Sequence, residues 1–133
     1  MRLNKKEIKK LTDLAIRGNV KAQSELGALY LTECISRRLP EKAFLFLLSA
    51  AEKGNIDAQY NLSLMYYFGD GVVKDDNEAM FWMSKSADQG YLGAQYNLAR
   101  LFRNDEGLNI VEAISWFEKN EGFLLVRDSL LAA

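Results

Sequence analysis

A repeat is clearest at residues 51–66 of this 133-residue chain, which read AEKGNIDAQYNLSLMY. The same spacing of small, polar and apolar residues occurs 36 positions earlier and 36 positions later. The members are Ala15, Gly18, Asn19, Ala22, Gln23, Leu26, Leu29 and Tyr30; Ala51, Gly54, Asn55, Ala58, Gln59, Leu62, Met65 and Tyr66; and Ala87, Gly90, Ala94, Gln95, Leu98, Leu101 and Phe102. A fixed period of this length indicates a repeat architecture.

The residues above form one repeated string, and a second string of regularly spaced residues interleaves with it. It consists of Ala43, Phe46, Leu47, Ala50 and Ala51, then Ala79, Trp82, Met83, Ser86 and Ala87, then Ala113, Trp116 and Phe117. The spacings of three and four in both strings are typical of one buried face of an α-helix. The last step is 34 rather than 36, because the loop after Gly107 is two residues shorter than the loop after Gly71. Each repeat is therefore predicted to be a hairpin of two helices.

Turn residues place the boundaries of these helices. Gly18, Gly54 and Gly90 stand where one helix ends and the next begins, a position that often needs a left-handed backbone, and Pro40 suits the first turn of a helix. We expect a capping helix at about 4–17, repeats at about 18–53, 54–89 and 90–121 with helices at about 20–33, 40–53, 56–68, 76–89, 92–103 and 110–121, and a terminal helix at about 123–131. No segment alternates as a strand does. The prediction is a single all-α domain.

Composition and charge exclude several classes of protein. Hydrophobic residues make up 49% and charged residues 26%, as in ordinary folded soluble proteins. Seventeen basic and 18 acidic residues give a net charge of -1, without the basic excess typical of nucleic-acid binding. The longest apolar run, residues 43–48, is too short to span a membrane.

The sequence has no histidine and one cysteine, Cys34. Histidine is the usual general base near neutral pH and a common metal ligand, so catalytic triads, Cys–His dyads and HExxH zinc sites are excluded together. A single cysteine cannot form an intramolecular disulfide, and residues 1–20 lack the continuous apolar stretch of a secretory signal. We therefore expect a cytoplasmic protein that is not an enzyme and binds no cofactor or metal.

The middle repeat continues in a specific pattern. It runs from Ala51 to Leu62 and goes on through Met65, Tyr66, Gly69, Asp70, Gly71, Val72, Asp75, Ala79, Trp82 and Ala87. This pattern resembles the Sel1-like repeat, a relative of the tetratricopeptide repeat. The resemblance implies an α/α right-handed superhelical solenoid of about three helical hairpins with a half-repeat at each end. The first repeat departs from the pattern, since Glu33 and Ile35 replace the paired loop glycines.

In this family, by the same resemblance, the first helices of the hairpins line a concave groove that holds other proteins. We predict that the partner-binding residues are those on these helices that the two strings leave unused: Tyr60, Asn61, Leu64, Tyr67, Tyr96, Asn97, Arg100 and Arg103, preceded by a polar start at Lys21, Ser24 and Glu25. Tyrosine and arginine are enriched at binding hot spots. Arg100 and Arg103 break the repeat pattern and suggest an acidic partner segment. The alternative for Tyr60 and Asn61 is packing between repeats.

Three further features of the sequence are weaker indications of function than the predicted groove. Gly69, Asp70 and Gly71 are expected to form a family turn rather than a phosphate or calcium loop. Lysines at 5, 6, 9 and 10 are expected to be a solvated capping face. An apolar patch is predicted for self-association or docking, with burial against a neighbouring helix as the alternative; its residues are Phe44, Leu45, Leu48, Leu124, Leu125 and Leu131.

The predicted function is a non-enzymatic scaffold or adaptor that binds a partner protein or peptide in its groove. The resemblance also suggests a narrower role, that of a bacterial immunity protein that neutralises a toxin or effector. The alternative is a small-molecule binder or weak hydrolase of the β-lactam type, as cysteine-rich relatives imply. Those relatives carry a cysteine pair in each repeat, and this chain does not.

Overall fold

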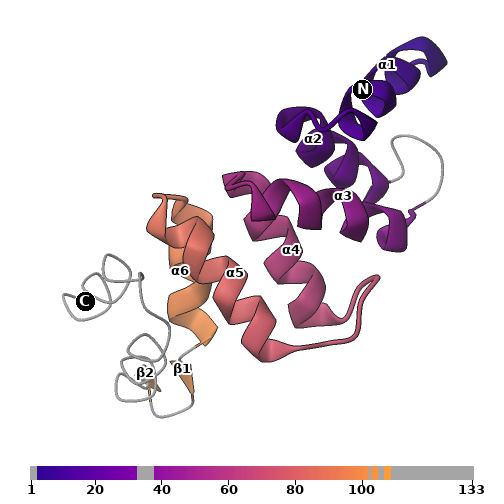
Figure 1. Ribbon diagram of the computed structural model, residues 1–133. Coiled ribbons are helices and arrows are strands. Elements are labelled where there is room, and N and C mark those ends of the chain that lie inside the picture. The colour runs from indigo at the N-terminus through magenta and orange to yellow at the C-terminus, as the bar shows by residue number, and fades with distance from the viewer. Residues whose placement is uncertain (1–2, 33–37, 102, 105–106, 109–133) are drawn as a thin grey trace.

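The computed structural model describes residues 3–32, 38–101, 103–104 and 107–108. In these residues six helices follow one another along the chain (Figure 1): α1 (Lys5–Ile16), α2 (Val20–Tyr30), α3 (Pro40–Glu52), α4 (Ile56–Phe68), α5 (Asp76–Asp88) and α6 (Leu92–Leu101). Each begins within one residue of its predicted start and ends within three residues of its predicted end. The all-α class is confirmed. The helices predicted at about 110–121 and 123–131 lie outside the described residues.

The expectation that no strand forms is wrong at one place. Two short strands, β1 (Arg103–Asn104) and β2 (Gly107–Leu108), pair in an antiparallel ladder. Asparagine and glycine are poor helix formers that favour tight turns, which explains why α6 ends at Leu101 instead of continuing to 103.

The helices stack as a repeat solenoid. Each helix packs against the next one in the chain, and α2 also contacts α4, so the first helices of successive hairpins are neighbours. Figure 1 shows the hairpins α2–α3 and α4–α5 following one another from the N-terminal end toward α6. A hairpin of this size cannot bury its apolar face alone, so stacking supplies the core. The predicted solenoid of helical hairpins is confirmed.

The two predicted strings form this core. Every alanine of the strings that lies in the described helices is at most 3% exposed. The leucines at 26, 47, 62 and 98 are completely buried, and full burial of such a side chain contributes roughly 1.5–3 kcal/mol. The buried residues form three clusters in chain order, around Leu26, around Leu62 and around Leu98.

The turns between successive repeats share the same backbone conformation. Gly18, Gly54 and Gly90 have φ angles of 96°, 94° and 97°, the left-handed conformation that the sequence predicts. In the first two turns the following asparagine caps the next helix, because the side chains of Asn19 and Asn55 accept hydrogen bonds from backbone N–H groups at 2.8 and 2.9 Å. The Gly-Asn pair thus ends one helix and begins the next.

A glutamine, buried in the first two turns and half-buried in the third, spans each of these turns. Its amide donates to the backbone carbonyl eight residues earlier, in the preceding helix, at 3.0–3.1 Å. The pairs are Gln23 with Ala15, Gln59 with Ala51, and Gln95 with Ala87. Each of these carbonyls also accepts from the N–H of the turn glycine at 3.0–3.1 Å, so the glutamine supplies a second donor at the helix end.

The loop after α4 packs against the start of α3. Gly71 has a φ of 76°, and a Cβ atom there would lie 2.6 Å from the carbonyl carbon of Pro40, so no larger residue fits. Asp70 in this loop forms an ion pair with Arg38. Asp75 caps α5 by accepting from the Glu78 N–H at 3.1 Å. These contacts support a structural turn.

The described residues contain neither a candidate metal site nor a candidate membrane span. No group of three or more histidine, cysteine, aspartate or glutamate side chains in this part of the chain could hold a metal ion. None of the helices in it combines the length and the apolar character that crossing a membrane requires.

Candidate partner-binding surface

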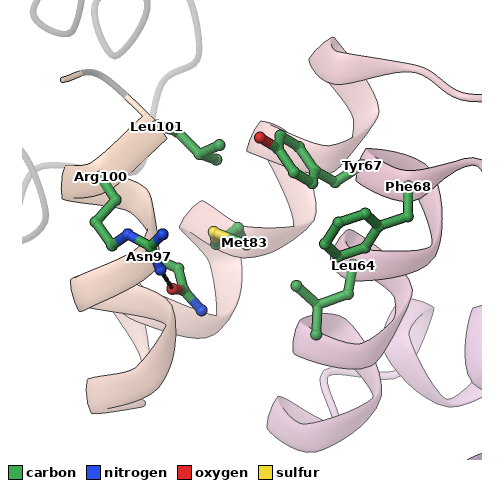
Figure 2. A pocket seen from close by; sticks show the side chains of 7 residues that line it. All are labelled: Leu64, Tyr67, Phe68, Met83, Asn97, Arg100 and Leu101. Atoms are coloured by element: carbon green, nitrogen blue, oxygen red, sulfur yellow. Dashed lines mark hydrogen bonds between the residues drawn. The ribbon is translucent and has the colours of Figure 1, made fainter. Parts of the chain in front are cut away.

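A cavity of about 440 Å³ opens between α4 and α6 (Figure 2). We call it the α4–α6 pocket. Its lining residues come from three helices: Leu64, Tyr67 and Phe68 from α4, Met83 from α5, and Asn97, Arg100 and Leu101 from α6. The first helices of two successive hairpins thus form its walls.

The floor of the pocket is apolar. Met83 is 2% exposed and belongs to the buried cluster around Leu98. Figure 2 shows its side chain between the two walls, with Leu64 and Phe68 on one side and Arg100 and Asn97 on the other. Leu64 and Phe68 are four residues apart and so share a face of α4. Phe68 is 70% exposed, so an apolar wall of the pocket reaches solvent.

Tyr60 and Asn97 hold the two walls together. The Asn97 side-chain amide donates to the Tyr60 hydroxyl at 2.6 Å. The Tyr60 ring also meets Tyr91 edge-on, with ring centroids 4.7 Å apart. Burial raises the pKa of Tyr91, and the nearby Tyr60 and Asp57 raise it further. The contacts of Tyr60 match the packing alternative given for it above.

Arg100 gives the pocket a cationic rim. Its guanidinium lies 5.7 Å from the centroid of the Tyr96 ring and 3.5 Å from the Asn97 side-chain oxygen. Within the described part of the chain no carboxylate pairs with it; the ion pairs there are Arg38 with Asp70 and Lys74 with Asp76. The charge of Arg100 is therefore not compensated by any carboxylate of the described residues.

Some of the predicted partner-binding residues line the pocket, and others do not. Leu64, Tyr67, Asn97 and Arg100 line the pocket, Tyr60 bonds to Asn97, and Tyr96 is exposed beside Arg100. Asn61 is half-buried, and its side chain makes no hydrogen bond with the described residues. The prediction that Arg103 lies on a first helix is wrong, since it belongs to β1.

One further expectation needs correction, and for another the structure favours the stated alternative. Ser24 is 6% exposed and does not belong to a polar groove surface, because α2 packs directly against both α3 and α4. In the predicted apolar patch, Phe44 and Leu48 are half-buried against the core around Leu62, and Phe44 meets Tyr66 edge-on at 5.7 Å. Leu45 remains 67% exposed. The patch residues at 124, 125 and 131, and also Cys34, lie outside the described residues.

Three lining residues were not predicted as partner-binding. Met83 and Leu101 belong to the two strings that form the core, and they also line the pocket. Phe68 could have been found, because it follows Leu64 by one helical turn and directly precedes the glycine that ends α4.

The Sel1 repeat family model matches residues 20–55, 56–91 and 93–119. Among solved structures, a Sel1 repeat protein from Oxalobacter formigenes is 33% identical with a TM-score of 0.68, over 84% of this chain and 48% of that one. The structure of c5321, a protective antigen present in uropathogenic Escherichia coli strains displaying an SLR fold, is 32% identical with a TM-score of 0.71, over 96% of this chain and 28% of that one. This chain thus spans about half and about a quarter of their lengths. No curated protein matches it.

Proposed function

This chain belongs to the Sel1 repeat family, and on that premise we propose that it is a non-enzymatic scaffold that binds a partner protein at the α4–α6 pocket. Sel1 repeat proteins generally mediate protein–protein interaction. The observation that carries the proposal is the pocket itself, which has a buried floor and an exposed Phe68. Its one charged lining residue, Arg100, has no ion-pair partner in the part of the chain that the structure describes. Concave surfaces that combine apolar side chains with a few polar groups are typical binding sites.

We propose further that the partner is acidic where it meets α6. Arg100 has no carboxylate neighbour among the described residues, and arginine is well suited to bind carboxylates through its planar fork. A cytoplasmic location fits a chain whose single cysteine cannot form an internal disulfide. A role as a bacterial immunity protein is the narrower form of the same proposal, and the identity of the captured partner would test it.

The test is affinity capture with matched variants. The immobilised chain and its Phe68→Ala/Arg100→Glu variant are incubated with lysate of the cells that produce the protein, and retained proteins are quantified by mass spectrometry. Both positions are exposed, so the variant should fold normally. A variant with Leu45→Ala and Arg17→Glu removes the same types of side chain at exposed positions that do not line the pocket.

We expect a partner that the wild-type chain and the control variant retain and that the pocket variant loses. The purified partner should then bind the wild-type chain in calorimetry. Equal retention of every protein by all three baits would contradict the proposed site.

A further inference from the structure

We infer, on the basis of the proposed function, that the α4–α6 pocket recognises a short segment in which a bulky apolar residue lies next to an aspartate or glutamate. The apolar side chain fills the pocket over Met83, and the carboxylate pairs with Arg100 at the rim. This goes beyond a general acidic partner, because it specifies which side chain enters the cavity and which remains outside it.

The size and lining of the pocket select an apolar side chain. An apolar cavity of about 150 Å³ is enough to hold one benzene molecule, so about 440 Å³ accommodates one large side chain with part of its neighbour. Leu64, Met83 and Leu101 surround this space with apolar groups. Phe68 at the mouth is exposed, and an inserted side chain would remove its ring from water, which favours binding in proportion to the apolar area buried.

The polar groups of the pocket select a carboxylate. The Asn97 amide nitrogen is already bonded to Tyr60, and the distance of 3.5 Å between Arg100 and the Asn97 oxygen is too long for a strong hydrogen bond. The described residues therefore leave most of the five N–H donors of Arg100 without a protein acceptor. The nearby Tyr96 ring lies within cation–π range and restricts where the guanidinium points.

The spacing of the two ligand groups follows from the lining. Asn97, Arg100 and Leu101 lie within two turns of α6, so the rim cation and the apolar cavity are adjacent. Consecutive Cα atoms are about 3.8 Å apart, so a residue that fills the cavity brings its immediate neighbours within reach of Arg100. A basic neighbour would be repelled by Arg100, which has no carboxylate partner among the described residues.

Selection from a phage-displayed library of random peptides tests this inference. Peptides of about 12 residues, which span about 40 Å when extended, are selected on the folded 133-residue chain. The affinities of enriched peptides are then measured on the wild-type chain, on Phe68→Ala and Arg100→Glu, and on the control variants Leu45→Ala and Arg17→Glu. For each peptide, a version with its acidic residue changed to the corresponding amide is measured as well.

We expect enriched peptides to share a bulky apolar residue beside an aspartate or glutamate. Phe68→Ala and Arg100→Glu should each weaken binding about tenfold or more, and the controls should change it by less than about twofold. Changing the peptide's acid to the amide should weaken binding to the wild-type chain, because it removes the ion pair, and should strengthen binding to Arg100→Glu, because it removes the repulsion between two carboxylates.

Other outcomes overturn the inference and separate it from the proposed function. Enriched peptides without the apolar–acidic pair, or peptides whose binding ignores both pocket variants, would refute the inference while leaving peptide binding intact. If no peptide is enriched but a captured partner protein still requires Phe68 and Arg100, the inference is refuted and the proposed function stands. If neither peptides nor a captured protein depend on these residues, both are refuted.

Discussion

Packing within the hairpin α4–α5 changes the acidity of the Tyr66 phenol. Its ring lies against the core around Leu62 and meets Phe44 edge-on. Burial raises the pKa of Tyr66 above its ordinary value of 10.0, and the negative charges of Glu78, Asp75 and Glu52 raise it further. The folded state therefore keeps this phenol neutral to a higher pH than the unfolded chain does.

This shift predicts a loss of stability at alkaline pH. Above about pH 10 the unfolded chain releases the phenolic proton first, so the stabilisation from neutral Tyr66 is complete below pH 10 and declines as the pH rises through the raised value. We expect the wild-type chain to lose more free energy of unfolding between about pH 9 and about pH 11 than Tyr66→Phe does, measured by urea denaturation. An equal loss in both proteins would show that Tyr66 does not contribute.

Individual residues also show where sequence-based prediction stops. The period placed Gly18, Gly54 and Gly90 in left-handed turns and Gln59 in the buried string, and the structure confirms both. It did not reveal that Asn19 and Asn55 are helix caps or that the glutamines bond across the turn. Periodicity reports which positions are buried, whereas a hydrogen-bond partner depends on the relative placement of two helices.

At the scale of elements, the glutamines join each hairpin to the helix before it. Gln59 is buried and has two partners, since it donates to the Ala51 carbonyl at 3.1 Å and accepts from the Gln89 amide at 2.6 Å. Gln95 occupies the equivalent position in the next repeat, is half-buried, and donates to the Ala87 carbonyl. Substitutions at Gln59 and Gln95 therefore compare a buried glutamine with a half-buried one.

We predict that Gln59→Ala destabilises the protein more than Gln95→Ala. Removing Gln59 deletes two hydrogen bonds, and each such loss costs roughly 0.5–1.5 kcal/mol, because the Ala51 carbonyl keeps the Gly54 N–H at 3.0 Å and the exposed Gln89 amide can bind water. Gln95→Ala should cost about 1 kcal/mol, because one partly exposed bond is lost. Urea denaturation of both variants measures the difference. Equal losses would mean that the Gln59–Gln89 contact adds nothing.

Helix ends mark a second limit of prediction at this scale. The start of every described helix was predicted to within one residue, because glycine, asparagine and proline signal it locally. The end of α6 was missed by two residues, and Arg103 was therefore placed on a helix although it pairs with Leu108 in a strand. Local turn propensity at Asn104 and Gly107 outweighed the repeat period there.

For the whole molecule, the solenoid keeps interactions local. The core consists of three clusters in chain order, and the described helices contact mainly their neighbours in sequence. The pocket depends on α4, α5 and α6. The sequence register identified outward-facing positions such as Leu64 and Arg100, but it could not predict a cavity, since the space between α4 and α6 depends on how far apart packing holds them.

A change far from the pocket should therefore leave binding intact. Gly27 lies where α2 and α3 approach most closely, since a Cβ atom there would lie 2.5 Å from Cγ of Leu47. Leu47 is completely buried and cannot move aside. Gly27→Val overpacks this contact and should lower the free energy of unfolding by about 2 kcal/mol.

The location of this damage tests whether the chain behaves as a solenoid with nearest-neighbour coupling. In hydrogen exchange, Gly27→Val should increase amide exchange in α1 to α3 while α6 keeps its wild-type protection, because the cluster around Leu98, to which α6 belongs, does not include either helix of the first hairpin. The affinity of the Gly27→Val variant for a ligand of the α4–α6 pocket should stay within about twofold of the wild-type affinity. A uniform increase in exchange across all described helices, with a matching loss of affinity, would instead show that the repeats unfold as one cooperative unit.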